Sequence, residues 1–112
     1  MVRAIFLFCC VLTAAPGVAA TDGIVRIGVL TSPLGVAGDL NGEGSILAAQ
    51  MAVEDFGGIV LGKPVEIVAA DHKNRPSVGA TIARRWFEHG GADVIVDVPN
   101  ASVAEAVRQV AR

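Results

Sequence analysis

Short β-branched apolar runs alternate along the chain with segments whose apolar residues recur at helical spacing. Each kind of segment occurs three times after residue 20. The apolar runs have the length and composition of strands buried on both faces, and they span 24–30, 65–70 and 93–98. A helical segment follows each run, at 45–56, at 76–89 and from residue 102 onward. The order βαβαβα predicts an α/β fold in three layers, with right-handed crossovers and a parallel sheet covered on both faces.

Glycine, proline and capping residues mark the ends of the predicted helices. Gly57-Gly58 ends the first helix, and Pro76 suits the first turn of the second. Ser102 and Glu105 match a capping box at the start of the third helix. A turn is expected at 61–64, just before the second strand.

The first twenty residues have the three parts of a secretory signal peptide. Arg3 supplies the positive charge, residues 4–12 form a short apolar core, and small side chains lead up to Ala20. The apolar core falls well short of the ~20 residues that span a bilayer, so the pattern favours cleavage after Ala20 over a membrane anchor. No later segment predicts a membrane span. The sequence therefore predicts an exported chain in which 1–20 is the signal peptide and 21–112 is one domain.

Composition and charge narrow the classes of function. The chain has 112 residues, a formal net charge of -2 and 4% aromatic residues. It carries neither a basic stripe for phosphates nor many stacking platforms for bases, so nucleic acid is not expected as a partner. Trp86 and Phe87 lie on the apolar face of the second predicted helix, and we expect them to pack on the sheet rather than to stack on a ligand.

The motifs of metal, cofactor and hydrolytic chemistry are missing from the sequence. Cys9 and Cys10 lie in the segment expected to be removed, and His72 and His89 lie on separate elements, where we expect both at the surface. A dinucleotide-binding motif should directly follow the first strand, whereas the Gly-rich segment at 42–47 lies a dozen positions later. No Gly-x-Ser-x-Gly elbow occurs. We therefore expect no metal, no cofactor and no enzymatic reaction.

Candidate binding residues follow the strands, because ligands of open parallel sheets lie beyond the carboxyl ends of the strands. At the start of the third helix, Asn100, Ala101 and Ser102 can offer backbone N–H groups and hydroxyls to a carboxylate. Asn100 and Ser102 can equally be helix caps. Asp71, at the end of the second strand, is expected to hold the N–H groups of its own loop. The three strand ends are 31–41, 71–74 and 99–102.

Several blocks of the sequence resemble the opening of one known family. The blocks span 25–33, 42–55, 62–68 and 71–74. Together they resemble the substrate-binding proteins of ABC transporters for branched-chain amino acids and related amides, which are periplasmic binding proteins of type I. These proteins have two α/β lobes, joined by a hinge, that close over a small solute. The resemblance implies that 21–112 is an amino-terminal lobe, and we expect a fragment because the last helix is still running at Arg112.

The resemblance also implies where a solute binds. The loop after the third strand would supply hydroxyl and backbone groups to the carboxylate and amino group of the ligand, and the loop after the first strand would face the ligand side chain across the cleft. The residues concerned are Asn100, Ala101 and Ser102 in the former loop and Gly38, Asp39 and Leu40 in the latter. Amino acid binders tend to carry a Ser-rich stretch where this chain has Asn100-Ala101, so an amide or an aromatic acid is an alternative solute.

The function implied by the resemblance is transport without chemistry. The protein would reside in the periplasm and deliver a small polar solute, such as a branched-chain amino acid, an amide or a related carboxylate, to the permease of an ABC transporter. The alternative is a ligand-binding sensor domain of the same fold that serves a receptor or regulator. A secreted enzyme is a distant third.

Overall fold

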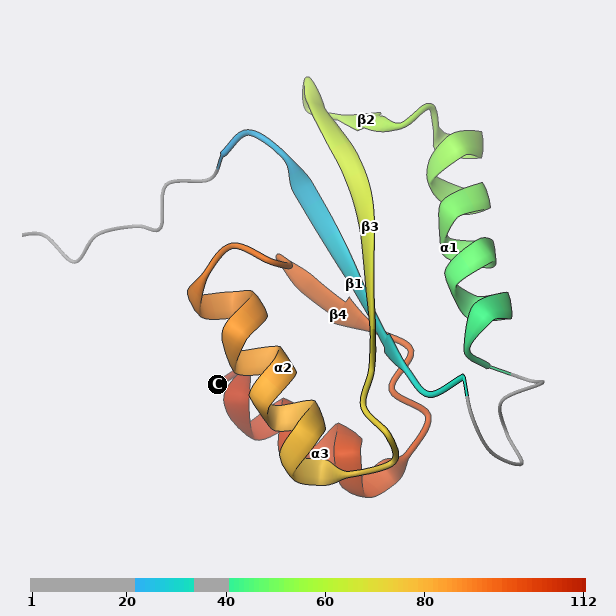
Figure 1. Cartoon of the computed structure of the whole chain (residues 1–112). Coiled ribbons are helices and arrows are strands. Elements are labelled where there is room, and N and C mark those ends of the chain that lie inside the picture. Colours follow the sequence, from blue (N-terminus) through green and yellow to red (C-terminus); the bar gives the residue numbers. More distant parts are fainter. Residues whose placement is uncertain (1–21, 34–40) are drawn as a thin grey trace, which may run out of the picture.

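The computed structural model describes residues 22–33 and 41–112 (Figure 1). The predicted signal peptide at 1–20 and the candidate residues Gly38, Asp39 and Leu40 lie outside the described residues. The strands, the helices and the residues that follow β3 and β4 all lie within them.

Strands and helices alternate in the order that the sequence predicts. The elements are β1 (Val25–Thr31), α1 (Glu43–Phe56), β2 (Ile59–Val60), β3 (Lys63–Asp71), α2 (Pro76–Glu88), β4 (Val94–Val96) and α3 (Ala101–Val110). Every predicted strand and helix is present, with ends displaced by no more than two residues. Within residues 22–33 and 41–112, no helix is both long enough and apolar enough to cross a membrane.

The sheet has the strand order β2-β3-β1-β4, and its central part is parallel. β1 pairs in parallel with β3 along its whole length, beginning with Val25 opposite Val65. On its other side β1 pairs in parallel with β4, beginning with Ile27 opposite Val94. These two pairings confirm the parallel sheet for the three predicted strands.

The sheet also has one antiparallel edge, formed by β2, that the sequence does not predict. β2 pairs antiparallel with β3 through a tight turn at Leu61 and Gly62. Both turn residues have positive φ, 50° and 75°, which suits a two-residue hairpin whose twist matches its strands. A strand of two residues is too short to show an alternation of apolar and polar positions, so the pattern of the sequence predicts only the turn.

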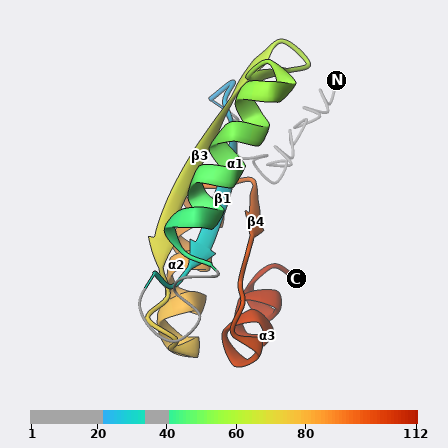
Figure 2. The same cartoon turned by 90° about the vertical axis from the view of Figure 1, so that its right-hand side faces the viewer.

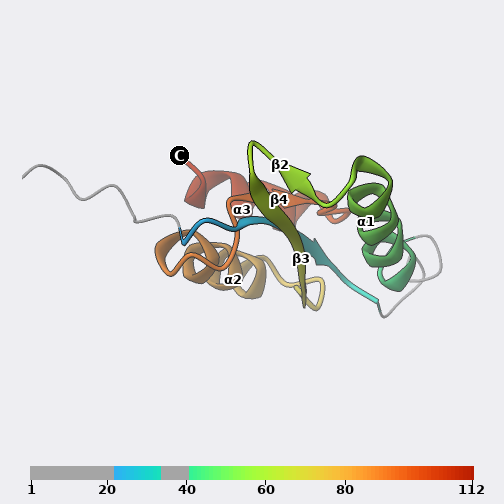
Figure 3. The same cartoon turned by 90° about the horizontal axis from the view of Figure 1, so that it is seen from above.

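Helices cover both faces of the sheet, as predicted. Figure 1 shows α1 on one side of the strands and α2 with α3 on the other, and Figure 2 shows α1 running along β3 and β1. Seen from above in Figure 3, α2 and α3 lie together on the side away from α1. Successive strand residues point to opposite faces, so Val25 and Ile27 face α1, whereas Gly28 and Leu30 face the α2–α3 layer.

The hydrophobic core lies between the sheet and the α2–α3 layer. Its buried residues are Leu30, Ala83, Val103 and Val107. Trp86 and Phe87 pack against them as partly buried side chains, which confirms that they are packing residues. α1, by contrast, contains no buried residue. The face under α2 and α3 therefore contributes most of the hydrophobic stabilisation.

α2 and α3 approach each other closely at Gly79. A Cβ at this position would lie 2.5 Å from Cγ1 of Val103 and 3.7 Å from Cβ of His72. The missing side chain lets the helices close over His72, which directly follows β3. This contact connects the core to the edge of the sheet where the strands end.

Candidate functional site

Three loops meet at the carboxyl edge of the sheet, the edge at which parallel sheets bind their ligands. β1, β3 and β4 run in the same direction, so the loops that follow them lie at the same edge. Thr31 is buried at the end of β1 and joins two of these loops. Its carbonyl oxygen accepts the N–H of His72 at 3.0 Å, and its Oγ1 accepts the N–H of Gly42 at 3.1 Å. The residue before α1 is therefore held against the ends of β1 and β3.

A chain of side-chain contacts crosses this edge. Nδ2 of Asn74 donates to Oγ of Ser32 at 3.4 Å, and Nδ2 of Asn100 donates to Oδ1 of Asn74 at 3.5 Å. Ser32 follows β1, Asn74 lies in the loop after β3, and Asn100 precedes α3. We call these three residues the edge network. Both contacts are long for hydrogen bonds, but together they link all three loops.

Asn100 caps α3. Its Oδ1 accepts the N–H groups of Ser102 and Val103, both at 3.1 Å, and the Ser102 hydroxyl at 2.7 Å. The capping box predicted from Ser102 and Glu105 is therefore wrong, and the alternative of Asn100 as the cap is confirmed. Glu105 instead pairs with Arg108, whose Nη2 lies 2.8 Å from Oε1 of Glu105.

The start of α3 presents fewer free donors than the sequence suggests. The N–H and hydroxyl of Ser102 are both engaged by Asn100, as described above. In the described part of the chain, the N–H of Ala101 makes no hydrogen bond. A carboxylate at this helix terminus would meet the Ala101 N–H directly, together with the partial positive charge of the helix end.

The loop after β3 is a tight turn with an unusual backbone. Lys73 and Asn74 both have φ 53°, in the left-handed region that asparagine tolerates better than most residues. Oδ1 of Asp71 accepts the N–H of Lys73 at 2.6 Å, which confirms that Asp71 holds its own loop. With Ser32, these residues line an open hollow of about 370 Å³ at the carboxyl edge. Its lining carries one side chain of each charge, Lys73 and Asp71.

His72 is fully buried, so the prediction of a surface histidine is wrong at this position. It lies beneath Gly79 and Val103, where the two helices close over it. Its Nδ1 accepts the N–H of Asn74 at 3.0 Å. Burial lowers the pKa of His72, although Asp71 and Asp97 oppose this by favouring the charged ring. Nε2 of His72 and Oδ2 of Asp97 are buried without a hydrogen-bond partner within residues 22–33 and 41–112.

We expect the protein to lose stability as the pH falls below 6.5, the ordinary pKa of histidine. Between that value and the lowered pKa of His72, the unfolded chain binds a proton that the folded chain does not, so the free energy of unfolding decreases as the pH falls. Below the lowered pKa this loss is complete. Urea unfolding at a series of pH values measures the effect. The His72→Gln variant should give a flatter profile than the wild type, because it lacks the titrating ring. A wild-type profile as flat as that of His72→Gln would contradict the prediction.

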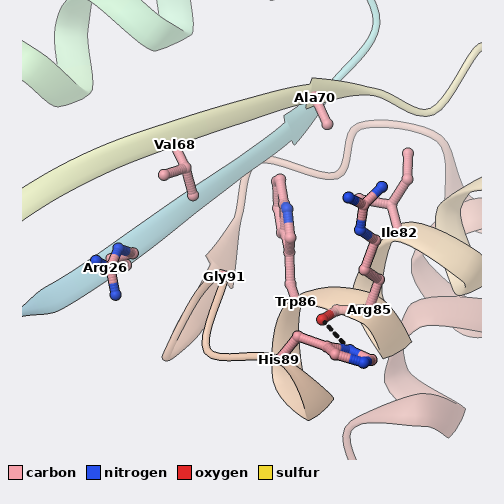
Figure 4. Close-up of a pocket in the computed structure, with 8 residues that line it drawn as sticks. All are labelled: Arg26, Val68, Ala70, Ile82, Arg85, Trp86, His89 and Gly91. Carbon is pink, nitrogen blue, oxygen red and sulfur yellow. Dashed lines mark hydrogen bonds between the residues drawn. The ribbon is translucent and has the colours of Figure 1, made fainter. Parts of the chain in front are cut away.

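A larger hollow, of about 520 Å³, lies on the α2 face of the sheet, away from the carboxyl edge. Figure 4 shows Arg85, Trp86 and His89 of the α2 region around it, with Arg26 of β1 opposite. Arg26 is already paired, with its Nη1 2.7 Å from Oδ2 of Asp22 and its Nε 3.4 Å from Oε2 of Glu66. The polar groups of several loops converge at the carboxyl edge and not here, which makes that edge the candidate site.

The structure brings together part of the site that the sequence predicts. Asn100, Ala101 and Ser102 lie at the carboxyl edge, as the strand order requires. Ser32 and Asn74 also lie at this edge, in the strand-end segments, although the sequence does not single them out as binding residues. A polar residue directly after a buried strand is the signal that points to Ser32. No local signal marks Asn74, because its role depends on contacts with two distant loops.

The chain belongs to the periplasmic binding protein family, because the family model with that description matches residues 24–112. Its fold is that of the amino-terminal lobe of a type I periplasmic binding protein, as the sequence resemblance implied. Members of this family bind substrates for transport. A search of curated proteins found no match.

Two solved structures are each 44% identical to the chain. One is a periplasmic binding protein from Burkholderia mallei, with a TM-score of 0.76, and the match covers 80% of this chain and 24% of that one. The other is a branched-chain amino acid ABC transporter periplasmic ligand-binding protein from Burkholderia xenovorans, with a TM-score of 0.73 and coverage of 77% and 23%. The chain therefore spans about a quarter of the length of these relatives.

A more distant structure shares the fold alone. It is an ABC transporter solute-binding protein from Rhodopseudomonas palustris in complex with benzoate, 23% identical, with a TM-score of 0.66 and coverage of 80% of this chain and 25% of that one.

Proposed function

We propose that this chain is the amino-terminal lobe of an extracytoplasmic solute-binding protein that delivers a small polar solute to the permease of an ABC transporter, without catalysing a reaction. The observation that carries the proposal is the convergence of Ser32, Asn74 and the capped start of α3 at the carboxyl edge of the sheet. Membership of the periplasmic binding protein family supports it. That membership also supports a periplasmic location, and the predicted signal peptide agrees with it.

The solute in this proposal carries a carboxylate or an amide. Its anionic or carbonyl oxygen lies against the start of α3, where the Ala101 N–H and the helix dipole favour negative charge. Beside it, the Asn100 amide has a second N–H in addition to the one that it donates to Asn74. Gly38, Asp39 and Leu40 face the remainder of the solute, as the family resemblance implies. A branched-chain amino acid and an aromatic acid both fit this description. The similar protein from Burkholderia xenovorans is described as part of a branched-chain amino acid transporter, and the one from Rhodopseudomonas palustris is in complex with benzoate.

We expect Asn100→Asp to weaken solute binding by about tenfold. The variant keeps an oxygen acceptor that caps α3, but it places a negative charge beside the solute carboxylate and removes an amide donor. Isothermal titration calorimetry of the full-length protein with leucine, isoleucine and benzoate measures the affinity. Gln109→Ala, near the other end of the same helix, is the matched control and should bind as the wild type does. Equal affinity of Asn100→Asp and wild type would return Asn100 to a purely structural role.

The same titration tests the proposed function as a whole. Binding of one of the three probes supports a solute-binding protein, and no heat from any of them would count heavily against it. The genes beside the reading frame separate the transport role from the sensor role. Permease and ATPase genes favour transport, whereas a receptor or regulator partner favours the alternative.

A further inference from the structure

The side chain of Asn74 occupies a central place at the carboxyl edge. It donates to Ser32 at 3.4 Å and accepts from Asn100 at 3.5 Å, so it is the member of the edge network that contacts both other loops. Its two partners lie 42 and 26 residues away along the chain. Removing this one side chain would leave the loops after β1 and β4 without a side-chain link through the loop after β3.

We propose that Asn74 is a positioning residue of the solute site: it holds the Asn100 amide, and with it the start of α3, in register with the loop after β1. This inference rests on the proposed function, since it concerns the same site. Asn74 acts through Asn100, whose Oδ1 engages Ser102 and Val103 and so sets the orientation of the first turn of α3.

The backbone of Asn74 is fixed independently of its side chain. Its N–H donates to Nδ1 of the buried His72 at 3.0 Å, and the N–H of Arg75 donates to the His72 carbonyl oxygen at 2.9 Å. His72 is in turn enclosed by α2 and α3 at Gly79. The side-chain amide of Asn74 is therefore attached to a backbone held by hydrogen bonds of its own. A side chain can align two other loops only if its own backbone is fixed in this way.

Asparagine suits this position for two reasons. It tolerates the left-handed φ of 53°, and its amide both donates and accepts, so it can satisfy a hydroxyl on one side and an amide on the other. Aspartate would keep the acceptor for Asn100 but lose the donor for Ser32. Glycine would keep the backbone conformation and lose both contacts.

The test compares Asn74→Gly with wild type in the full-length protein, titrated with leucine, isoleucine and benzoate. We expect the affinity for the probe that binds to fall by about 2- to 10-fold, the size expected for the loss of weak hydrogen bonds. Leu61→Gly is the matched control, because Leu61 also has a left-handed φ, 50°, and lies in the β2–β3 turn, away from the site. This control should bind as wild type does.

A double-mutant cycle separates positioning from general stability. If Asn74 acts through Asn100, Asn74→Gly should reduce affinity much less in the Asn100→Asp background than in the wild type. Additive effects on affinity would overturn the proposal. Equal affinity of wild type and Asn74→Gly would overturn it while leaving the proposed function intact.

A second measurement needs no solute. Amide hydrogen exchange at Ser102 and Val103, whose N–H groups donate to Asn100, should be about 2- to 10-fold faster in Asn74→Gly than in wild type. Unchanged exchange at both amides would overturn the positioning role. If no probe binds to wild type, the proposed function fails, and this measurement alone decides whether Asn74 positions Asn100.

Discussion

Replacing Leu30 by Ala is expected to lower the free energy of unfolding by about 2–5 kcal/mol. Leu30 is fully buried in the central strand, in the core formed with Ala83, Val103 and Val107. The substitution removes apolar contacts and leaves a cavity between β1 and both helices of that face, and neither side can collapse freely because the sheet is paired on both sides of β1. Urea unfolding followed by circular dichroism measures the loss.

Leu61→Ala is the control for this substitution. Leu61 is 96% exposed in the turn between β2 and β3, so the same chemical change should alter the stability by no more than about 0.5 kcal/mol. A loss below about 1 kcal/mol for Leu30→Ala would show that the core is not where the structure places it.

Gly28→Val is expected to destabilise the protein by about 3 kcal/mol, through overpacking rather than through a cavity. A Cβ on Gly28 would lie 2.5 Å and 2.7 Å from two ring carbons of Trp86 and 3.0 Å from Cβ of Ala92. Valine ordinarily favours a strand more than glycine does, so a loss of stability would show that contact with Trp86 outweighs the intrinsic preference.

Two variants test the cause of this loss. Gly28→Val combined with Trp86→Leu should recover part of the stability, because the smaller side chain makes room for the valine. Gly44→Ala is the matched control, since a Cβ there meets nothing within 4 Å in helix α1. It should raise the stability by roughly 0.5–1 kcal/mol. A neutral Gly28→Val would be inconsistent with the close approach of Trp86.

Local pattern predicted the elements well where they are long. The β-branched runs of β1 and β3 and the apolar stripe of α2 repeat often enough to reveal their period. β2 has two residues and no period, and it exists because the turn at Leu61 and Gly62 returns the chain onto β3. Its pairing is a property of the hairpin and not of its own residues.

The start of α3 shows how packing selects between two local signals. Asn100 and Ser102 are both residue types that favour the N-cap position. Ser102 also matches a capping box, because Glu105 follows it by three residues. The structure begins the helix at Ala101, with Val103 and Val107 buried in the core. Because the helix begins at Ala101, Asn100 is the cap, and Glu105 pairs with Arg108 instead of with the backbone.

The sequence predicts a surface position for His72, because nothing in its neighbours along the chain distinguishes it from an exposed residue after a strand. Its burial follows from Gly79, whose lack of a side chain lets α2 and α3 close over it. The same enclosure supplies the acceptor for the Asn74 N–H. The close packing at Gly79 thus both buries the titratable ring of His72 and fixes the backbone of Asn74 in the proposed site.

The amino-acid sequence by itself determined the order of strands and helices, the parallel pairing of the long strands, the family and the edge at which polar residues gather. These properties depend on hydrophobic periodicity and on residue types within a few positions of one another. Tertiary structure alone decided the pairing of β2, the burial of His72 and the link from Ser32 through Asn74 to Asn100. The latter contacts join residues 42 and 26 positions apart, and such contacts exist only once packing has brought their loops to one edge.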